Sequence, residues 1–208
     1  ERTTASPMLY LSVFKNARFS AASGTITIVF FALMGSLFLM TQYWQLVHGY
    51  TPLQAGVRLL PQAATMMIVA PLSARAVERA GTKRVVLVGL AFVTTGLTLL
   101  STIQPDTQYV VVISYLAIMA AGMGMTMAPA TESVMGSLPR EKAGVGSAVN
   151  DTTRQVGGAL GVAIIGSIVS SVYAARITGA AAAAGLEGDP AARAESSLGA
   201  AQKVAASL

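Results

Sequence analysis

Three ionisable residues, Glu132, Asp151 and Arg154, fall within or beside long apolar stretches where charged side chains are rare. Asp151 and Arg154 are three residues apart, so they share one face of a helix. An ionisable side chain at membrane depth marks a functional site by default. The structural alternative is that Arg154 only neutralises the two acids near a helix end. The functional one is that a carboxylate alternates between pairing with Arg154 and unpaired burial, and so releases and takes up a proton.

These three side chains lie at similar distances from the ends of their stretches. At 1.5 Å per residue, Glu132 is about 9 Å, Asp151 about 12 Å and Arg154 about 16 Å inside the same edge. They can therefore meet if the two helices are neighbours. We predict a contact between Arg154 and either Glu132 or Asp151, and a role in proton coupling for a charge network of these three residues and Asn150.

Other residues on which catalysis depends are scarce. The chain has no cysteine and a single histidine, His48, which excludes disulfides, thiolate metal sites and cysteine nucleophiles. It also contains no HExxH or GxSxG motif. We therefore predict that the protein is not an enzyme and that it binds no metal or organic cofactor.

The elements that must position the charged residues are five stretches almost free of charge. Each is close to or above the roughly 20 apolar residues that a helix needs to cross a bilayer. Only 11% of the residues are charged, against about 25% in soluble domains. Backbone groups in lipid must be satisfied internally, so the spans are helices and the fold class is all-α integral membrane. The five stretches are Phe19–Val47, Leu59–Ala76, Val85–Ile103, Val110–Ala130 and Gly144–Tyr173.

Basic residues in the connections give these spans a direction. Lys and Arg are enriched in short cytoplasmic loops. They precede the first span and lie between spans two and three and between spans four and five, whereas the loops at 48–54 and 104–109 have none. We predict a multi-pass protein of the cell membrane with its N-terminus cytoplasmic and its C-terminal tail extracytoplasmic. Because the net charge of +5 is spread over such turns, it does not indicate nucleic-acid binding.

Three regions follow from this pattern. Residues 1–18 are a cytoplasmic linker, 19–173 a five-helix bundle, and 174–208 an extracytoplasmic loop leading to a missing last helix. Within that loop, Asp189 and Pro190 resemble a helix start, which predicts a short helix over Pro190–Ala206. Since the chain begins with Glu1 rather than Met, we expect it to be part of a longer protein.

The turn between spans two and three carries a recognisable motif. A tight turn needs a residue that tolerates positive φ, and Gly81 supplies it. The run Glu78-Arg79-Ala80-Gly81-Thr82-Lys83 resembles the Asp-Arg-x-Gly-Arg-Lys/Arg loop of the major facilitator superfamily, with Glu78 in place of Asp and Thr82 departing from the pattern. The resemblance implies a cytoplasmic gating loop, whereas the charges alone indicate only a cytoplasmic turn. The gating-loop candidates are Glu78, Arg79, Gly81, Lys83 and Arg84.

Two further stretches resemble the fourteen-helix drug/proton antiporter branch of that superfamily. Residues 43–61 are similar to its outer connection after helix nine, and residues 138–161 to its junction between helices twelve and thirteen. Asn150 and Arg154 match the family pattern, whereas Glu132 and Asp151 do not belong to its general form. The resemblance implies that the five spans are helices nine to thirteen, and hence most of a six-helix half-bundle.

Glycine, methionine and glutamine residues suggest roles in helix packing and in substrate binding. Gly157 and Gly161 form a GxxxG on the last span with Gly158 beside them, which predicts close helix packing. Met123 belongs to a methionine stripe that suits apolar ligands but is as compatible with ordinary core.

Gln45 is expected to face a cavity, because an amide facing lipid is unsatisfied, and Tyr43 lies nearby. Trp44 and Tyr50 are expected in the interfacial aromatic belt, with His48 solvated.

The function that these features predict is secondary active transport, in the form of proton-driven export of amphipathic or cationic drugs by alternating access. The energy source is the proton gradient. The expected partners are the lipid bilayer, a small-molecule substrate and the N-terminal half of the same polypeptide, in a monomeric transporter. Two alternatives stay open: an exporter of one defined metabolite, and a non-transporting structural subunit.

Overall fold

The computed structural model describes residues 11–139 and 143–183, and in this part of the chain the secondary structure is helical with connecting turns and no strand. A short 3₁₀ turn at Leu11–Lys15 precedes the first helix. The helices are α1 (Ala17–Gln42), continued by a π-helical turn (Tyr43–Val47), α2 (Pro52–Ala80), α3 (Thr82–Leu100), α4 (Tyr109–Met135) and α5 (Ala143–Ala183).

Five helices of the described chain are long and apolar enough to cross a membrane, as the sequence predicts. The fold class is therefore all-α with five membrane-spanning helices. The two largest differences from the expected spans are at the start of α2 and the end of α5. Helix α2 begins at Pro52 rather than Leu59, and α5 continues through alanine-rich sequence to Ala183, inside the region predicted as a loop. The short helix predicted over Pro190–Ala206 lies outside the described residues.

Local capping fixes where the helices begin. The side chain of Asn16 accepts hydrogen bonds from the backbone of Arg18 and Phe19 and so caps α1. At α2, Thr51 and Gln54 form a capping box, and Pro52 occupies the first helical position. The early start of α2 therefore comes from polar capping residues that a count of apolar residues omits.

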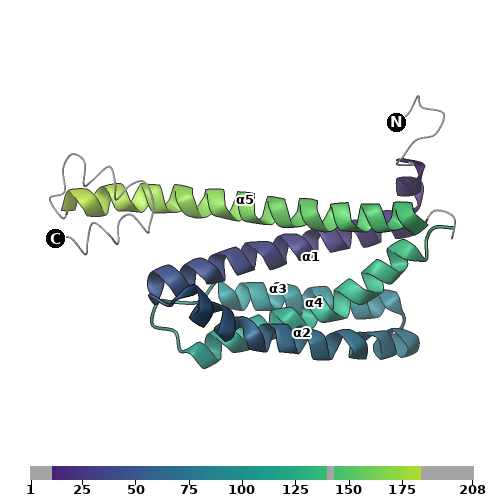
Figure 1. The fold of residues 1–208 in the computed structure, drawn as a ribbon, viewed down its shortest axis with the longest axis horizontal. Helices are drawn as coiled ribbons and strands as arrows, with labels where there is room; N and C mark the ends of the chain where they lie inside the picture. The colour runs from purple at the N-terminus through teal and green to yellow at the C-terminus, as the bar shows by residue number, and fades with distance from the viewer. Residues whose placement is uncertain (1–10, 140–142, 184–208) are drawn as a thin grey trace.

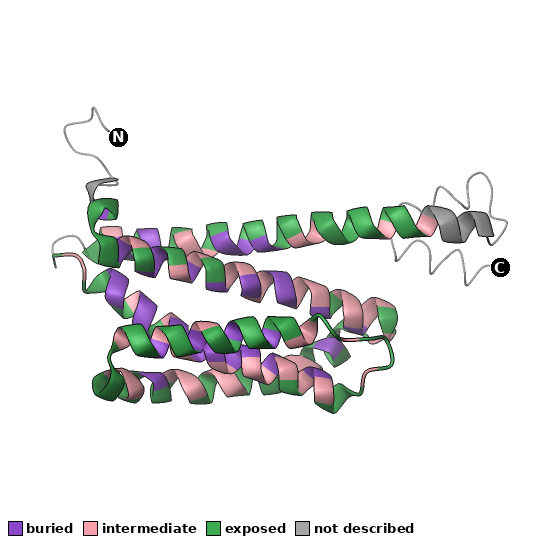
Figure 2. Cartoon of the chain, turned by 180° about the vertical axis from the view of Figure 1, so that it is seen from behind, coloured by how far each residue is buried: buried purple, intermediate pink, exposed green. Residues whose placement is uncertain are grey.

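Helix α4 lies at the centre of a four-helix group, and α5 packs on its edge (Figure 1). α4 packs extensively against α2 and α3 and also against α1, whereas α5 packs mainly against α1. One core cluster consists of apolar side chains from α1 to α4 and the π-helical turn, among them Val29, Trp44, Leu116 and Met119. A second cluster joins the start of α1 to the end of α4 and to Val149 of α5. Much of α5 and the outer faces of α2 and α3 are exposed (Figure 2). Those faces carry large apolar side chains, as expected for surfaces that contact lipid or further helices.

A single residue, Gly81, connects α2 to α3. It adopts φ 80° and ψ 150°, so the predicted positive φ is confirmed. This backbone region is accessible essentially only to glycine, and its cost for other residues is about 1–3 kcal/mol. The two long helices can therefore reverse direction with no intervening loop.

We expect Gly81→Ala to lower the midpoint of thermal unfolding of the full-length protein, because alanine is strained by about 1–3 kcal/mol in this conformation. The matched control is Gly56→Ala in α2, where an added Cβ meets nothing within 4 Å. There alanine should be neutral or slightly stabilising, by up to about 1 kcal/mol. Equal melting temperatures for the two variants would show that the turn relaxes without strain.

Candidate functional site

Arg154 lies on α5 about 16 Å from the start of the helix at Ala143, at 1.5 Å per residue. Its side chain crosses to α4, where Nη2 donates a hydrogen bond to Thr131 Oγ1 at 3.1 Å. Its Cζ also lies 5.4 Å from the ring centroid of Phe30 on α1, within the range of a cation–π contact. Arg154 thus joins three helices.

The guanidinium is not fully satisfied by these contacts. Its Nε is buried and has no hydrogen-bond partner among the described residues. One helical turn earlier, Asn150 is 7% exposed and its Oδ1 is also buried with no partner in the described chain. Unpaired buried polar atoms are costly, so these two side chains are suited to bind a further polar group.

The predicted contact between Arg154 and an acid is absent from this conformation. Glu132 and Asp151 are both exposed, and within the described ranges neither forms an ion pair with Arg154. Thr131 is the residue turned toward Arg154, so its neighbour Glu132 is rotated about 100° away around α4. Asp151 is exposed although it is only three residues before Arg154. The role of either acid in proton coupling stays a prediction.

A groove opens between α1 and α5 beside Arg154. We call it the α1–α5 groove; its volume is about 380 Å³, and it is lined by Phe30, Met34, Arg154, Gln155, Gly158, Ala159 and Val162. One guanidinium and one amide therefore border an otherwise apolar surface with an aromatic ring and a methionine. This combination suits an amphipathic small molecule, because apolar area supplies affinity and a few polar groups fix orientation.

Glycines bring the two walls of this groove together. A Cβ added at Gly157 would overlap the carbonyl group of Thr27, and one added at Gly161 would overlap that of Phe31. Gly158 faces the flexible side chain of Met34 instead. The GxxxG pair thus brings α5 into direct backbone contact with α1, which is the close approach that small residues permit in membranes.

An aromatic cluster closes the opposite end of α1. Trp44 is 1% exposed and contacts the rings of Tyr43, His48, Tyr50 and Tyr109. These rings enclose Trp44, and its position in the interfacial aromatic belt stays a prediction. His48 is likewise packed among aromatic rings, and its Nε2 is buried with no partner in the described residues, rather than solvated.

The three residues predicted to line a substrate cavity are placed differently from one another. Tyr43 donates a hydrogen bond from its hydroxyl to the carbonyl of Gln104, which ties the end of α1 to the α3–α4 connection. Gln45 is half-buried in the π-helical turn. Met123 is fully buried in the core, because its face of α4 packs against neighbouring helices. Met123 therefore fills the core of the described bundle and does not line the α1–α5 groove.

The gating-loop candidates surround the α2–α3 turn. Glu78, Arg79, Gly81, Lys83 and Arg84 are all exposed, and no ion pair joins them to other residues that the structure describes. The turn thus presents mainly positive charge at one end of the bundle.

Sequence reasoning missed Thr131 and Phe30 as partners of Arg154. For Thr131, the only available signal was a hydroxyl beside Glu132 at the expected depth.

Comparison with known proteins adds independent information. The family model described as Major Facilitator Superfamily matches residues 1–162. The chain is 33% identical over 177 residues to the multidrug resistance protein Stp of Mycobacterium tuberculosis, covering 85% of this chain and 33% of that protein. It is 30% identical over 171 residues to the tetracenomycin C resistance and export protein of Streptomyces glaucescens, covering 82% and 32%.

A third relative matches along the whole chain. The multidrug efflux pump LfrA of Mycolicibacterium smegmatis is 28% identical over 208 residues, which is 100% of this chain and 41% of that protein. The chain thus spans between 32% and 41% of the length of these relatives.

Proposed function

This chain belongs to the major facilitator superfamily, and from that premise we propose that it acts as part of a proton-coupled exporter of amphipathic or cationic drugs. As a member of a transporter family it is not an enzyme. Two of the relatives are named for multidrug resistance or efflux and one for export of tetracenomycin C, which supports an exporter. The structural observation that supports the proposal is Arg154, which borders the α1–α5 groove and whose buried Nε has no hydrogen-bond partner among the described residues.

In the proposed mechanism, Arg154 changes partners as the transporter changes conformation. In the present arrangement it donates to Thr131. In the alternate arrangement it pairs with a carboxylate, either Glu132, Asp151 or an acid from another part of the full-length protein. A carboxylate paired with Arg154 gives up its proton, and one that loses this partner while buried takes a proton up. This exchange would couple the proton gradient to rocking of the two halves around the substrate.

Neutralisation of the Arg154 charge on pairing also bears on substrate class. An unpaired Arg154 guanidinium repels a cationic drug. When a carboxylate neutralises the guanidinium, the apolar lining of the groove can bind the drug without this repulsion. Export of cations therefore requires the paired arrangement while the drug is bound. Amphipathic neutral compounds are compatible with both arrangements, because Phe30 and Met34 supply apolar contact area.

The orientation that we propose follows from charge. Lys15, Arg18, Arg79, Lys83 and Arg84 lie at the end of the bundle that carries the α2–α3 turn, and Arg58 lies at the other end, where it stacks on Tyr50. By the positive-inside rule the turn is cytoplasmic, which also places the start of α1 inside and the end of α5 outside. We propose that the protein functions in the cell membrane as a monomer, together with the N-terminal half of the same polypeptide.

The test is proton-driven transport by the full-length protein in proteoliposomes. An imposed pH gradient should drive movement of a fluorescent cationic dye across the membrane, and a protonophore should abolish it. Protein-free vesicles provide the baseline. Absence of gradient-driven flux for any dye tested, with folded protein in the membrane, would instead favour a structural subunit.

A second candidate is export of one defined metabolite, which the relative named for tetracenomycin C export supports. Competition in the same vesicles distinguishes the two. A multidrug exporter is inhibited by many chemically unrelated amphipathic compounds, because apolar contact tolerates different shapes. A metabolite exporter is inhibited by compounds of one chemical class.

A further inference from the structure

Three buried polar atoms with no hydrogen-bond partner among the described residues lie in the first halves of α1 and α5. They are Ser23 Oγ on α1, and Asn150 Oδ1 and Arg154 Nε on α5. Ser23 is 3% exposed and Asn150 is 7% exposed. The described helices already cover these atoms, so a further helix packed on the outside of the bundle could not reach them. A partner for them must therefore be small.

Helix geometry brings the three side chains to one place. α1 and α5 lie side by side and start at the same end of the bundle (Figure 1), and an added Cβ at Gly157 would overlap the backbone of Thr27. Arg154 lies three residues before Gly157, about 4.5 Å toward that end, and Ser23 lies four residues before Thr27, about 6 Å. Both spacings keep a side chain on the same helix face. Asn150 is one turn before Arg154, about 5–6 Å away at Cβ.

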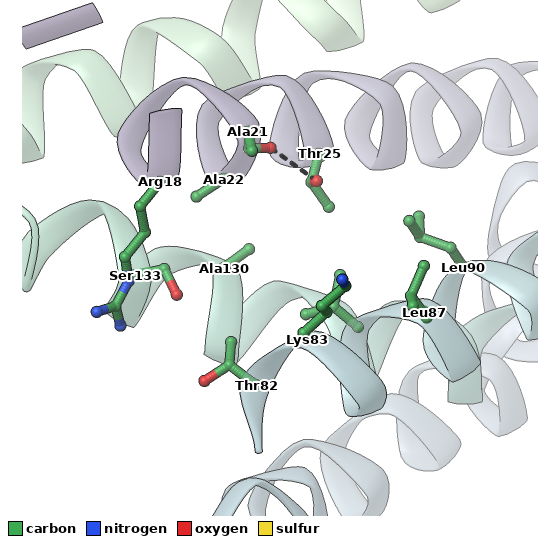
Figure 3. A pocket seen from close by; sticks show the side chains of 11 residues that line it. Arg18, Ala21, Ala22, Thr25, Thr82, Lys83, Leu87, Leu90, Ala130 and Ser133 are labelled. Carbon is green, nitrogen blue, oxygen red and sulfur yellow. Dashed lines mark hydrogen bonds between the residues drawn. The ribbon is translucent and has the colours of Figure 1, made fainter. Parts of the chain in front are cut away.

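Ser23 differs from other hydroxyl residues of α1. The hydroxyls of Thr25, Thr27 and Ser36 donate to carbonyl groups of α1 itself, at 2.8, 3.0 and 2.9 Å. Figure 3 shows the first of these bonds, from Thr25 to Ala21. Such bonds satisfy a hydroxyl without a partner outside its own helix. The Ser23 hydroxyl forms none, although it is as buried as Ser36, so it is available to another group.

The donors and acceptors at this junction suit a water molecule. A buried water forms about three hydrogen bonds to polar groups that are otherwise unsatisfied. Arg154 Nε can only donate, Asn150 Oδ1 can only accept, and a serine hydroxyl can do either. The carbonyl oxygen of Asn150 would repel an anion and the guanidinium would repel a cation, whereas water can use both.

We propose that Ser23, Asn150 and Arg154 bind water that enters between α4 and α5, and that this water takes up the proton from the carboxylate that pairs with Arg154. This inference rests on the proton coupling in the proposed function. In the release step the O–H bond of the carboxylic acid breaks and its proton bonds to a water oxygen. The electron pair stays on the carboxylate, whose charge the guanidinium neutralises.

The packing of the three helices indicates how water reaches the site. α1 and α5 are in backbone contact through Gly157 and Gly161, whereas α4 and α5 make few contacts. The hydrogen bond from Arg154 to Thr131 links α4 to α5. When Arg154 leaves Thr131 for a carboxylate, this link is lost and α4 can separate from the α1–α5 pair. Water then has to pass only about 9–16 Å along the helices, counted from the starts of α1 and α5.

The experiment measures water access to the junction by cysteine labelling of the full-length protein, with any cysteines outside this chain replaced. This chain has none of its own. Ser23→Cys and Asn150→Cys are labelled with a water-soluble, membrane-impermeant methanethiosulfonate on the side of the α2–α3 turn, at fixed pH on that side. During transport they should react at least about tenfold faster than matched controls, because the reactive thiolate forms in water and is suppressed in apolar surroundings.

The matched controls are Ile26→Cys and Val149→Cys, two buried positions near the test sites but within the apolar cluster that joins α1, α4 and α5. Equally slow labelling of all four variants, in vesicles that transport dye, would overturn the water site and leave the exporter standing. Equally fast labelling would show general opening of the bundle and would also overturn it. Selective labelling without proton-driven transport would support the water site and overturn the proton step.

A second measurement tests the Ser23 hydroxyl without a reactive label. Ser23→Ala should slow pH-driven transport about 2- to 10-fold, the effect of one lost hydrogen bond, while counterflow exchange falls less. The control is Ser36→Ala, which removes a similarly buried hydroxyl that is bonded within α1 and should change the two assays to the same extent. An equal loss in both assays for Ser23→Ala would assign this residue to helix packing.

Discussion

The double variant Gly157→Ala/Gly161→Ala is expected to separate α5 from α1 and to lower the melting temperature of the full-length protein by several degrees. Each added methyl group would overlap a backbone carbonyl of α1, at Thr27 and Phe31, and a backbone cannot rotate away as a side chain can. Overpacking of this kind costs about 1–3 kcal/mol per site. The cost of the double variant should be less than the sum of the two single costs, because one movement of the helices apart relieves both overlaps.

A matched set of variants distinguishes this effect from a general sensitivity to substitution. Gly158→Ala meets the Cγ of Met34 at 2.9 Å, and Met34 can adopt another rotamer, so the cost should be smaller than at Gly161. Gly24→Ala in α1 meets nothing within 4 Å in the described structure and should be neutral or slightly stabilising. A ranking in which Gly24→Ala destabilises as much as the double variant would contradict the proposed backbone contact.

The same double variant should also reduce transport, for a reason that stability alone does not supply. Phe30 and Gly158 lie on opposite walls of the α1–α5 groove. Moving the helices apart would widen the groove and withdraw Arg154 from Thr131, which lies across the interface on α4. Transport measured per folded protein should therefore fall even at temperatures well below the melting transition.

The fold could be predicted from the sequence because its main signal is local. A run of about 20 apolar residues is sufficient to identify a spanning helix, whatever it packs against. Gly81 was equally predictable, since a helix reversal in one residue demands a positive φ. The start of α2 was missed because Gln54 and Arg58 interrupt the apolar run, although Thr51 and Gln54 carry the capping signal.

The contacts of the candidate site could not be predicted in the same way. Which side chain meets Arg154 depends on the rotation of α4 relative to α5, and a shift of one residue turns a helix by about 100°. That rotation places Thr131 rather than Glu132 toward the guanidinium. For the same reason Met123, one member of a stripe that suits a ligand site, faces the core. The sequence gives the type of each residue and its distance from the end of its helix. The direction in which each side chain points around the helix axis depends on how the helices pack.

Replacing Arg154 with glutamine is expected to reduce proton-driven transport by the full-length protein about 10- to 100-fold. Hydrogen bonds to a charged group contribute about 1.5–3 kcal/mol each, which corresponds to this range of rates when one is lost. Glutamine can still reach a neighbouring hydroxyl, but it supplies neither the positive charge nor the several donors of a guanidinium. The loss should therefore appear in transport more than in the melting temperature.

Variants around Arg154 test which of its properties matters. Arg154→Lys keeps the charge but loses the planar array of donors, so it should recover only part of the activity. Thr131→Val removes the observed acceptor and should have an intermediate effect, whereas Thr131→Ser keeps the hydroxyl and should be close to wild type. The control is Arg176→Gln, an exposed arginine near the far end of α5, which should leave transport unchanged.

The proposed role of Arg154 in proton coupling leads to a more specific prediction. If Arg154 releases a proton from a paired carboxylate, Arg154→Gln should abolish accumulation against a gradient while still allowing slow downhill movement of substrate, because the carboxylate then keeps its proton. Counterflow exchange of labelled for unlabelled substrate, which needs no net proton movement, should fall less than pH-driven uptake. An equal loss in both assays would assign Arg154 to substrate binding or to helix packing. Wild-type rates in both would exclude it from the transport mechanism.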